Sequence, residues 1–406
     1  MSRLALAVLL ALASFTGTAA AQRPPQIPHG HEELYKDSPT IELVTMGIGG
    51  LMWERHGHIA LCVVYPDRED CYNYGVGDFH EPLAMAWGFI RGRHSFWVAK
   101  QPFDEMMWIY HYTDRTIWRQ PLPLTADQKK KVIDKLELDI LEDNKYYAYD
   151  HFADNCTTRV RNILDDATGG ALKTLTDEPT DGKTFRDLAR DGFFGMKEFS
   201  RSMLLVTDLV MGRSTDRVPS YWDRMFLPQY LREAVVKKWG VQPIVWYQRH
   251  GDPAITDKQL CSDGAIVHQG GDCTPNGPSG RILFVLAILA LTAPAWLTRL
   301  WGRFQRIGLA FAVIPPALIG LVFWFLAIAT PLPYLHINET CLVLMPLDLA
   351  LLFLPMRVRI RYAQGRVAIL ALLAILMVIG VLAQPIAWLV LWPIIPAAVV
   401  GFWPKR

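Results

Sequence analysis

Hydrophobic residues recur with two different periods along the first half of the chain. Runs at 41–46, 58–65 and 71–74 have the length and the β-branched or aromatic composition of strands, and turn-forming residues at 47–50 and 66–69 separate them. Because strands joined by short turns pair as neighbours, these runs predict an antiparallel sheet.

Two later segments have the period of helices. Thr125 and Gln128 form a capping box that opens a helix running to about 141, with its hydrophobic residues on one face. A second helix is expected to begin near Cys156 and to end at the Gly-Gly pair 169–170. The mixture of strands and helices indicates the α+β class.

The hydrophobic pattern changes abruptly after residue 280. Long runs almost free of charge follow at 282–298, 307–335, 340–356 and 367–404. Their lengths suit membrane helices of about 20 residues, and Gln384-Pro385 divides the last run into two. Asp348 interrupts the third run. An all-α transmembrane bundle of about five helices is therefore predicted for 281–406.

The charges between these runs predict their orientation. Basic residues follow the first, third and fifth spans, at Arg299, Arg303, Arg306, Arg357, Arg359, Arg361, Arg366, Lys405 and Arg406. The alternate connections, 331–339 and the turn at Gln384, contain neither Lys nor Arg. Because basic loops stay in the cytoplasm, residues 22–280 are predicted to face the periplasm from a bacterial inner membrane.

The N-terminal segment has the features of a secretory signal. An apolar run from Leu4 to Phe15 precedes small residues that end at Ala21. A signal peptide is expected, with an uncleaved anchor helix as the alternative. The whole pattern predicts a signal peptide at 1–21, a flexible arm at 22–39, a periplasmic domain at 40–235, a linker at 236–280 and a membrane domain at 281–406.

Charge and composition limit the possible partners. The 406-residue chain has 41 basic and 39 acidic residues, and 51% of its residues are hydrophobic. No basic block interleaved with aromatic residues stands out in the soluble part. Nucleic acid is therefore not expected as a partner, whereas the hydrophobic excess after residue 280 predicts a membrane.

Export determines how the six cysteines are interpreted, since disulfides persist in the periplasm. Cys62 and Cys71 flank a turn, and a two-residue hairpin loop would place them opposite each other. Cys261 and Cys273 bracket a Gly-rich stretch and form a second candidate disulfide. Cys341 lies at a membrane boundary. Cys156 is thus the soluble-domain thiol without an obvious partner.

Cys156 stands at the expected start of a helix, where backbone N–H groups and the helix dipole favour a thiolate. Asn155 or Asp154 would cap this helix, and the N–H of Cys156 would help to bind an oxyanion, with Asn155 as a further donor. Arg159, one turn later, adds positive charge, which an ionised Asp154 would oppose. These features are typical of a cysteine nucleophile.

His58 is the best candidate for the base that activates this thiol. It opens the second predicted strand, and strand alternation places it on the same face as Ala60. The hairpin register sets Asn73 beside Ala60 on that face. Asn73 or the nearby Asp78 would then orient the imidazole.

Simpler explanations exist for both residues. Cys156 also fits a small buried hydrophobic residue, and His58 fits a hydrogen-bonded structural histidine. His56 and His151 are neighbours that would substitute for His58. A zinc site formed by these three histidines and Cys156 is conceivable, but the sequence has no metal-ligand spacing such as C-x-x-C, and no metal is expected.

Ordered motifs carry a family resemblance. They are RHGHIAL at 55–61, YNYG at 72–75, YDHFADNCTTR at 149–159, TFRDL at 184–188, MGRSTDR at 211–217 and FLP at 226–228. Together they resemble the Lnb N-terminal periplasmic domain family over roughly residues 40–235. The resemblance implies a permuted papain-like fold of the NlpC and lecithin:retinol acyltransferase type, with His58 as strand histidine and Cys156 as helix-start nucleophile.

The resemblance also implies a reaction. Lnb-type proteins are lipoprotein N-acyltransferases, so an acyl chain would pass from a membrane phospholipid, through a Cys156 thioester, to the N-terminal amine of diacylglyceryl-cysteine lipoproteins. No cofactor is implied. Two alternatives stay open, a periplasmic cysteine peptidase or amidase acting on cell-wall peptide and a non-catalytic membrane scaffold.

Several other residues are candidates for contact with lipid. His336 and Asn338 lie on the predicted periplasmic loop between spans two and three, and Asp348 lies within span three. Each would either bind lipid head groups or stabilise the helix bundle. His336 and Asn338 would do the latter as helix caps, and Asp348 would do so as part of a buried ion pair. Aromatic residues at 86–90 and 96–97 would enter the membrane interface, line an acyl groove or belong to an ordinary core.

Overall fold

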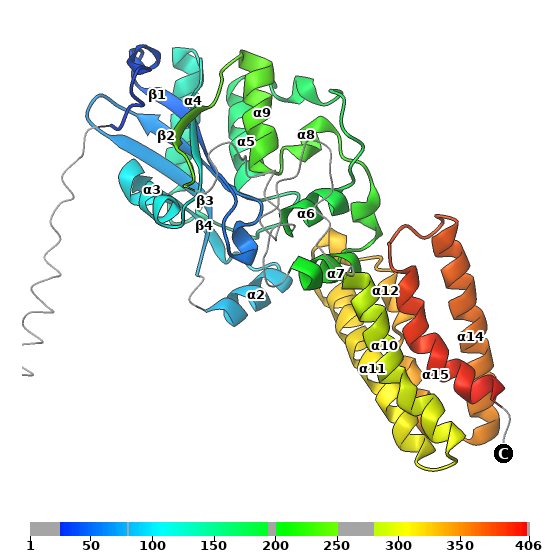
Figure 1. Ribbon diagram of the computed structural model, residues 1–406. Coiled ribbons are helices and arrows are strands. Elements are labelled where there is room, and N and C mark those ends of the chain that lie inside the picture. The colour runs from blue at the N-terminus through cyan, green and yellow to red at the C-terminus, as the bar shows by residue number, and fades with distance from the viewer. Residues whose placement is uncertain (1–24, 79–80, 194–199, 251–279, 404–406) are drawn as a thin grey trace, which may run out of the picture.

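The computed structural model describes residues 25–78, 81–193, 200–250 and 280–403. A sheet domain built from the N-terminal part lies at one end of a bundle of long helices built from the C-terminal part (Figure 1). This architecture confirms the predicted fold class. The expected signal peptide, and Cys261 with Cys273, lie outside the described residues.

A seven-stranded antiparallel sheet forms the core of the N-terminal domain, in the order β6-β4-β3-β2-β1-β5-β7. Its strands are β1 (Thr40–Met46), β2 (His58–Val64), β3 (Glu69–Gly77), β4 (Phe96–Pro102), β5 (Ile117–Pro121), β6 (Tyr146–Tyr147) and β7 (Ile244–Tyr247). The predicted strands correspond to β1, β2 and β3. β2 and β3 form the expected hairpin, in which Cys62 pairs opposite Cys71 and forms a disulfide with it.

Helices cover both faces of this sheet. They are α2 (Pro82–Ile90), α3 (Phe103–Tyr112), α4 (Ala126–Asp139), α5 (Cys156–Ala167), α6 (Phe185–Phe193), α7 (Ser200–Val210), α8 (Tyr221–Arg224) and α9 (Pro228–Trp239). α4, α5 and α9 bury one face, and α3 buries the other. α4 and α5 begin where the sequence predicts, after the caps Thr125 and Asn155.

The two segments that the sequence analysis treats as arm and linker contact the sheet. Arg119 is fully buried between the carboxylates of Glu42 and Glu69. Tyr35, in the 3-10 helix Glu32–Tyr35, is also buried and donates to Glu42, so the arm closes over this buried charge. β7 pairs with β5, and the domain therefore extends beyond the expected boundary at 235. A lone buried charge is costly, which explains why the arm is ordered here.

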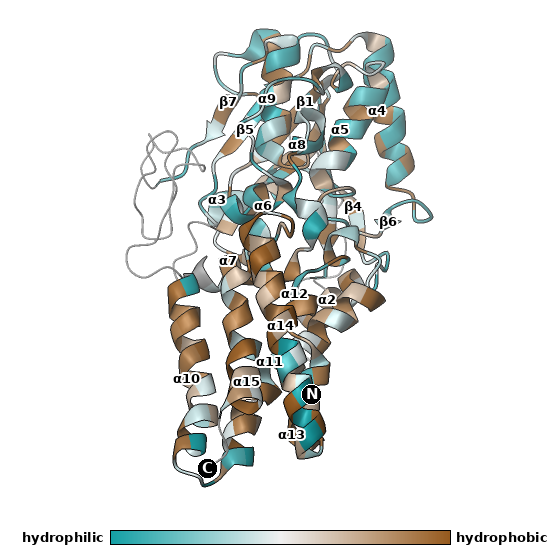
Figure 2. Ribbon diagram, turned by 90° about the vertical axis from the view of Figure 1, so that its right-hand side faces the viewer, coloured by the Kyte–Doolittle hydropathy of each residue, from teal (hydrophilic) through white to brown (hydrophobic). Residues whose placement is uncertain are grey.

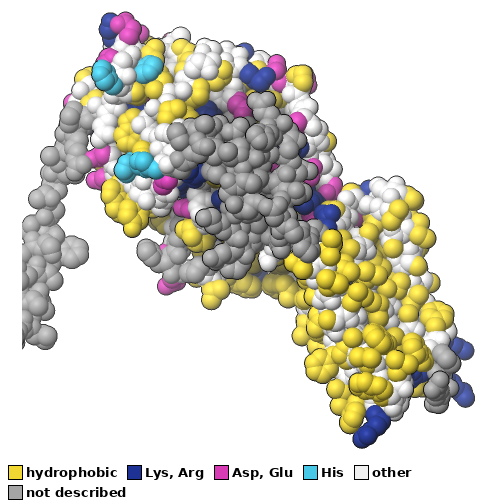
Figure 3. Space-filling view, viewed as in Figure 1, with side chains coloured by type: hydrophobic (Ala, Val, Ile, Leu, Met, Phe, Trp, Pro, Cys, Tyr) yellow, Lys and Arg dark blue, Asp and Glu magenta, His cyan; other side chains and the backbone are white. Residues whose placement is uncertain are grey.

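Four segments of the C-terminal region are long and apolar enough to span a membrane, and a shorter apolar helix follows them. Its helices are α10 (Gly280–Leu300), α11 (Gln305–Ala329), α12 (Thr340–Val343), α13 (Ala350–Phe353), α14 (Met356–Val378) and α15 (Leu391–Phe402). The surface of the bundle is largely hydrophobic, and basic side chains lie at the end away from the sheet domain (Figures 2 and 3). This distribution agrees with the predicted orientation.

The third span differs from the continuous helix that the pattern predicts. It consists of α12, the 3-10 helix Pro346–Leu349 and α13. Asp348 accepts hydrogen bonds from Arg366 Nε at 2.9 Å and from Tyr362 Oη at 2.9 Å, and Arg366 Nη2 donates to Val343 O at 2.6 Å. A broken helix frees carbonyl groups, which must find partners inside a membrane. Arg366 therefore belongs to the bundle interior rather than to a cytoplasmic loop.

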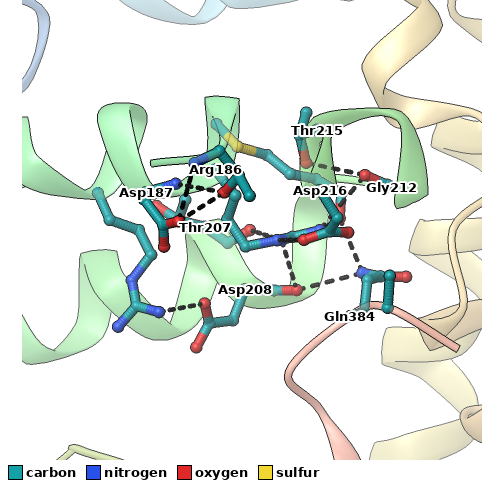
Figure 4. Close-up of polar contacts among 12 residues, drawn as sticks. Arg186, Asp187, Thr207, Asp208, Gly212, Thr215, Asp216 and Gln384 are labelled. Atoms are coloured by element: carbon teal, nitrogen blue, oxygen red, sulfur yellow. Dashed lines mark hydrogen bonds and ion pairs between the residues drawn. The ribbon is translucent and has the colours of Figure 1, made fainter. Parts of the chain in front are cut away.

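The sheet domain is fastened to the bundle at the last turn of α7. Carbonyl groups at the end of a helix lack partners within the helix. Asn338 Nδ2 and Gln384 Nε2 donate to them from the bundle at distances of 2.7 to 3.2 Å. The accepting carbonyls are those of Asp208, Leu209, Val210 and Met211. Arg186 of α6 binds the same turn from the opposite side (Figure 4).

Candidate active site

Cys156 is the first residue of α5, and its thiol is free and buried, with 7% of the residue exposed. Asn155 forms the N-cap, because its Oδ1 accepts from Thr157 N and Thr158 N, each at 2.9 Å. This cap fixes the first turn and directs its remaining N–H groups toward the cysteine. The helix start thus places a thiol beside backbone N–H groups, an arrangement that can favour a thiolate or bind an oxyanion.

The sulfur lies where α5 meets β2 and β3. Its side-chain hydrogen-bond partner is Thr157 Oγ1 at 3.8 Å. Burial raises the pKa of the Cys156 thiol, and hydrogen bonds from Thr157 and from the backbone N–H groups of Ile59, Thr157 and Cys156 oppose the rise. The resting group is therefore a neutral thiol that needs a base.

A β-bulge in β3 makes room for this cysteine. The pairing of β3 with β4 shifts between Tyr74 and Val76, and Gly75 has a φ of +84°. A Cβ on Gly75 would lie 3.5 Å from Cys156 Cβ and 3.4 Å from the Tyr149 ring. Glycine permits both the left-handed backbone and this close approach.

His58 begins β2, next to the residue whose N–H faces the sulfur. Its Nε2 is hydrogen-bonded to Asn73 Oδ1, as the predicted register suggests, and its ring stacks at 6.0 Å from that of Tyr110. Since Oδ1 is an acceptor, Nε2 carries the proton and Nδ1 the lone pair. Among the described residues no hydrogen bond joins His58 to Cys156. The two residues are nevertheless neighbours through Ile59.

The environment of His58 keeps its imidazole neutral. Burial lowers the pKa of His58 to about 4, Arg115 lowers it further, and the hydrogen bond to Asn73 acts in the opposite direction. Burial also lowers the pKa of His56 to about 3 and that of His151 to about 4. His56 Nε2 contacts Ala189 O at 3.0 Å, which indicates a structural role.

Asn155 caps α5 as the sequence predicts, but its amide group and the charge of Arg159 are both engaged by other protein groups. Asn155 Nδ2 donates to His151 O at 2.7 Å and to Phe226 O at 2.9 Å, so both amide hydrogens are engaged. An oxyanion would therefore rely on other donors. Arg159 forms a bidentate ion pair with Asp154, at 2.6 and 2.8 Å, which neutralises most of its charge.

The remaining candidates are one exposed residue and three residues of the C-terminal region. Asp78 is exposed beyond the end of β3. His336 Nε2 contacts Thr330 O at 2.7 Å, and Asn338 binds the end of α7. Asn338 and Asp348 are buried, so their side chains bind protein groups rather than lipid. Among the described residues, the candidate metal cluster combines Glu69 with the two disulfide-bonded cysteines of the β2–β3 hairpin, whose sulfurs are not available as thiolates.

Two tyrosines that are not among the predicted site residues, Tyr147 and Tyr149, lie beside Cys156. Tyr147, in β6, has a buried hydroxyl that the backbone N–H of Gly75 approaches and whose own proton has no acceptor among the described residues. A Cβ on Gly75 would lie 3.7 Å from that hydroxyl, so the phenol and Cys156 approach the same point. Burial first, and then the charge of a Cys156 thiolate, raise the pKa of Tyr147 and of Tyr149. Both phenols therefore stay protonated. The sequence around Tyr147 and Tyr149 gives no signal that either side chain lies beside Cys156.

Comparisons with known proteins agree with this geometry. Residues 29–191 match the family described as the Lnb N-terminal periplasmic domain, which confirms the resemblance seen in the motifs. A search of curated proteins found no match, and neither did a search of solved structures. The matched domain and the four apolar segments indicate a membrane protein with a periplasmic N-terminal domain.

Proposed function

We propose that this protein, which carries an Lnb N-terminal periplasmic domain, is an inner-membrane lipoprotein N-acyltransferase that uses Cys156 as its nucleophile. The observation that supports this proposal most is a free thiol at a helix start, beside a neutral histidine, in a domain fastened to a membrane bundle. The acyl donor would be a membrane phospholipid. The acceptor would be the N-terminal amine of a diacylglyceryl-cysteine lipoprotein.

The reaction proceeds in two acyl transfers. His58 Nδ1 takes the thiol proton, and the Cys156 sulfur attacks the ester carbonyl of the phospholipid. The C–O bond breaks, and the lysophospholipid alkoxide leaves with the proton from His58. The lipoprotein amine then attacks the thioester, and His58 accepts a proton from this amine. The C–S bond breaks, His58 passes the proton to the Cys156 thiolate, and the acylated lipoprotein is released as an amide. Catalytic hydrogen bonds that are absent at rest often form with substrate, and here a side-chain rotation must bring Nδ1 to the sulfur.

The tetrahedral intermediates need donors for the oxyanion. The Cys156 N–H lies in the first turn of α5, where N–H groups lack partners within the helix. Tyr147 Oη is the second donor that we assign, because it is buried beside the nucleophile and its proton is not otherwise used. A donor held in place before the reaction costs no reorganisation as the charge develops.

Removal of this phenol gives a specific prediction. Tyr147→Phe is expected to lower the rate of acyl-enzyme formation by about 10²-fold, the typical loss of one oxyanion donor, with little change in thermal stability. Single-turnover measurements with a phospholipid donor test it. Tyr146→Phe is the matched control, because Tyr146 is 43% exposed and adjacent in the sequence. A Tyr147→Phe rate equal to that of Tyr146→Phe would exclude the phenol from catalysis.

Intact-mass analysis tests the proposed function itself. Wild type, Cys156→Ser and Cys341→Ser are incubated with a defined phospholipid and no acceptor. We expect wild type and Cys341→Ser to gain one acyl chain that hydroxylamine removes, and Cys156→Ser to gain none. Cys341 is a matched control because it is the other buried free thiol among the described residues. If neither adduct nor lysophospholipid forms, the peptidase or scaffold alternative replaces the proposal.

A further inference from the structure

α2 presents an apolar face that no described part of the chain covers. Leu83 is 86% exposed and Trp87 is 45% exposed, and Ala84 and Ala86 beside them are exposed as well. The helix Pro82–Ile90 contains no charged residue. Isolated exposed hydrophobic residues are ordinary, but a helix whose whole outer face is apolar indicates a surface that is covered in use.

The position of α2 suggests what covers it. The Trp87 ring stacks on Phe325 of α11, at 6.1 Å and an interplanar angle of 4°. Just after α2, Gly92 has a φ of +61°, and a Cβ there would lie 2.4 Å from Pro331 Cγ. The helix is thus attached to the end of α11 that faces the sheet domain, beside the bundle (Figures 1 and 2). Its outer face continues the hydrophobic surface of the bundle.

The charges around α2 complement a phospholipid surface. Arg91, Arg93 and His94 follow directly after the helix, and all three are exposed. The Arg91 guanidinium lies 5.9 Å from the centre of the Trp87 ring. Cations next to an apolar helix can bind phosphates while the apolar side chains enter the acyl region. Glu81, at the N-cap, is the acidic group at the other end of the helix.

The inner face of α2 leads from this surface to the thiol. Phe89 contacts the ring of Tyr149 at a centroid distance of 6.3 Å, and Phe96 contacts the same ring at 4.7 Å. Tyr149 packs against the Gly75 position that Cys156 also contacts. Phe89 additionally packs with Leu332 of the bundle. Aromatic contacts therefore lead from α2 to Gly75, the position that Cys156 also approaches.

We propose that α2 lies in the periplasmic leaflet of the membrane and receives the donor phospholipid there. Leu83 and Trp87 lie among the acyl chains, Arg91 and Arg93 bind the phosphates, and the donor chain passes along Phe89 and Tyr149 to Cys156. The second half of this inference rests on the proposed acyl transfer. The first half, insertion of α2, does not depend on catalysis.

Spin labelling tests the insertion. The full-length protein carrying Cys156→Ser and Cys341→Ser receives a label at Leu83→Cys or at Leu138→Cys, in vesicles of phosphatidylethanolamine and phosphatidylglycerol. Leu138 is the matched control because it is 49% exposed and lies on α4, a helix of the sheet domain. We expect the label at 83 to collide mainly with oxygen and the label at 138 mainly with a water-soluble nickel complex. A label at 83 that collides equally well with the nickel complex, or that shows dipolar broadening from a second copy, would overturn the inference.

A charge on the same face tests donor delivery. Leu83→Glu is expected to lower thioester formation from vesicle phospholipid by at least about tenfold, because a carboxylate disfavours insertion. The variant should keep the wild-type rate with a water-soluble short-chain ester, and Leu138→Glu should keep both rates. If Leu83→Glu reacts normally with vesicles, the proposed delivery route is wrong, whereas the proposed acyl transfer is unaffected. If wild type forms no thioester with either donor, the proposed function fails, and the spin-label result alone decides whether α2 is inserted.

Discussion

Replacement of His58 by alanine is expected to lower the rate of acyl-enzyme formation near neutral pH by about 10²–10⁴-fold, the usual contribution of a general base. Burial raises the pKa of Cys156, so few molecules carry a thiolate near neutral pH without a base. His58, whose pKa burial lowers to about 4, is neutral there and can accept the proton. Single-turnover rates against pH measure the effect.

The pH profile distinguishes a base from a structural residue. The wild-type rate should fall as the pH approaches about 4 and His58 becomes protonated. The His58→Ala rate should instead keep rising with pH until the thiol itself ionises. His151→Phe is the control, because His151 is a second buried histidine with a pKa lowered to about 4 that we assign no catalytic role. Equal losses in both variants, or an unchanged profile in His58→Ala, would remove His58 from the mechanism.

Features that depend on neighbours in sequence were predictable. The alternating runs of β1 to β3, the caps of α4 and α5 and the hairpin that joins Cys62 to Cys71 are all encoded within about a dozen residues. Hairpin register then places Asn73 on the face of His58, and the structure contains their hydrogen bond. The orientation of the membrane domain was readable because basic loops report it directly.

Features that depend on distant contacts were not predictable. Tyr147 reaches Cys156 because a two-residue strand, β6, joins the edge of the sheet, and two residues carry no periodic signal. Asp348 interrupted an apolar run, but its partner Arg366 was indistinguishable from the loop arginines before it. The contacts that order the arm were not predictable either, because Arg119 lies far in the sequence from its two partners, Glu42 and Glu69.

A buried cation, Arg186, stabilises the junction between the two parts of the molecule, where Arg281 of α10 also pairs with Asp208 of α7. Arg186 is 2% exposed, and its Nε lies 2.6 Å from Asp216 Oδ1. Its other nitrogens donate at 2.8 to 3.3 Å to the carbonyls at the end of α7, the turn that the bundle holds from the opposite side. These carbonyls are those of Thr207, Asp208, Met211 and Gly212.

Arg186→Met is therefore expected to lower the free energy of unfolding by about 3–5 kcal/mol, since it leaves the partly buried carboxylate of Asp216 and several buried carbonyls without their cation. Thermal or denaturant unfolding in lipid nanodiscs measures this loss. Arg213→Met is the matched control, because Arg213 is exposed on the 3-10 helix Arg213–Asp216 that follows the same turn. The free energy of unfolding of Arg213→Met should differ from that of the wild type by less than about 0.5 kcal/mol.

The same substitution separates seating of the domain from chemistry. His58 lies on β2 and Cys156 on α5, outside the turn that Arg186 binds, so the thiol and the imidazole should keep their positions in molecules that stay folded. Below its unfolding temperature, Arg186→Met should react normally with a soluble short-chain ester and more slowly with vesicle phospholipid, because the turn that the bundle binds is held less firmly to α6. Equal losses with both donors would mean that the junction supports the fold of the active site rather than its position above the membrane.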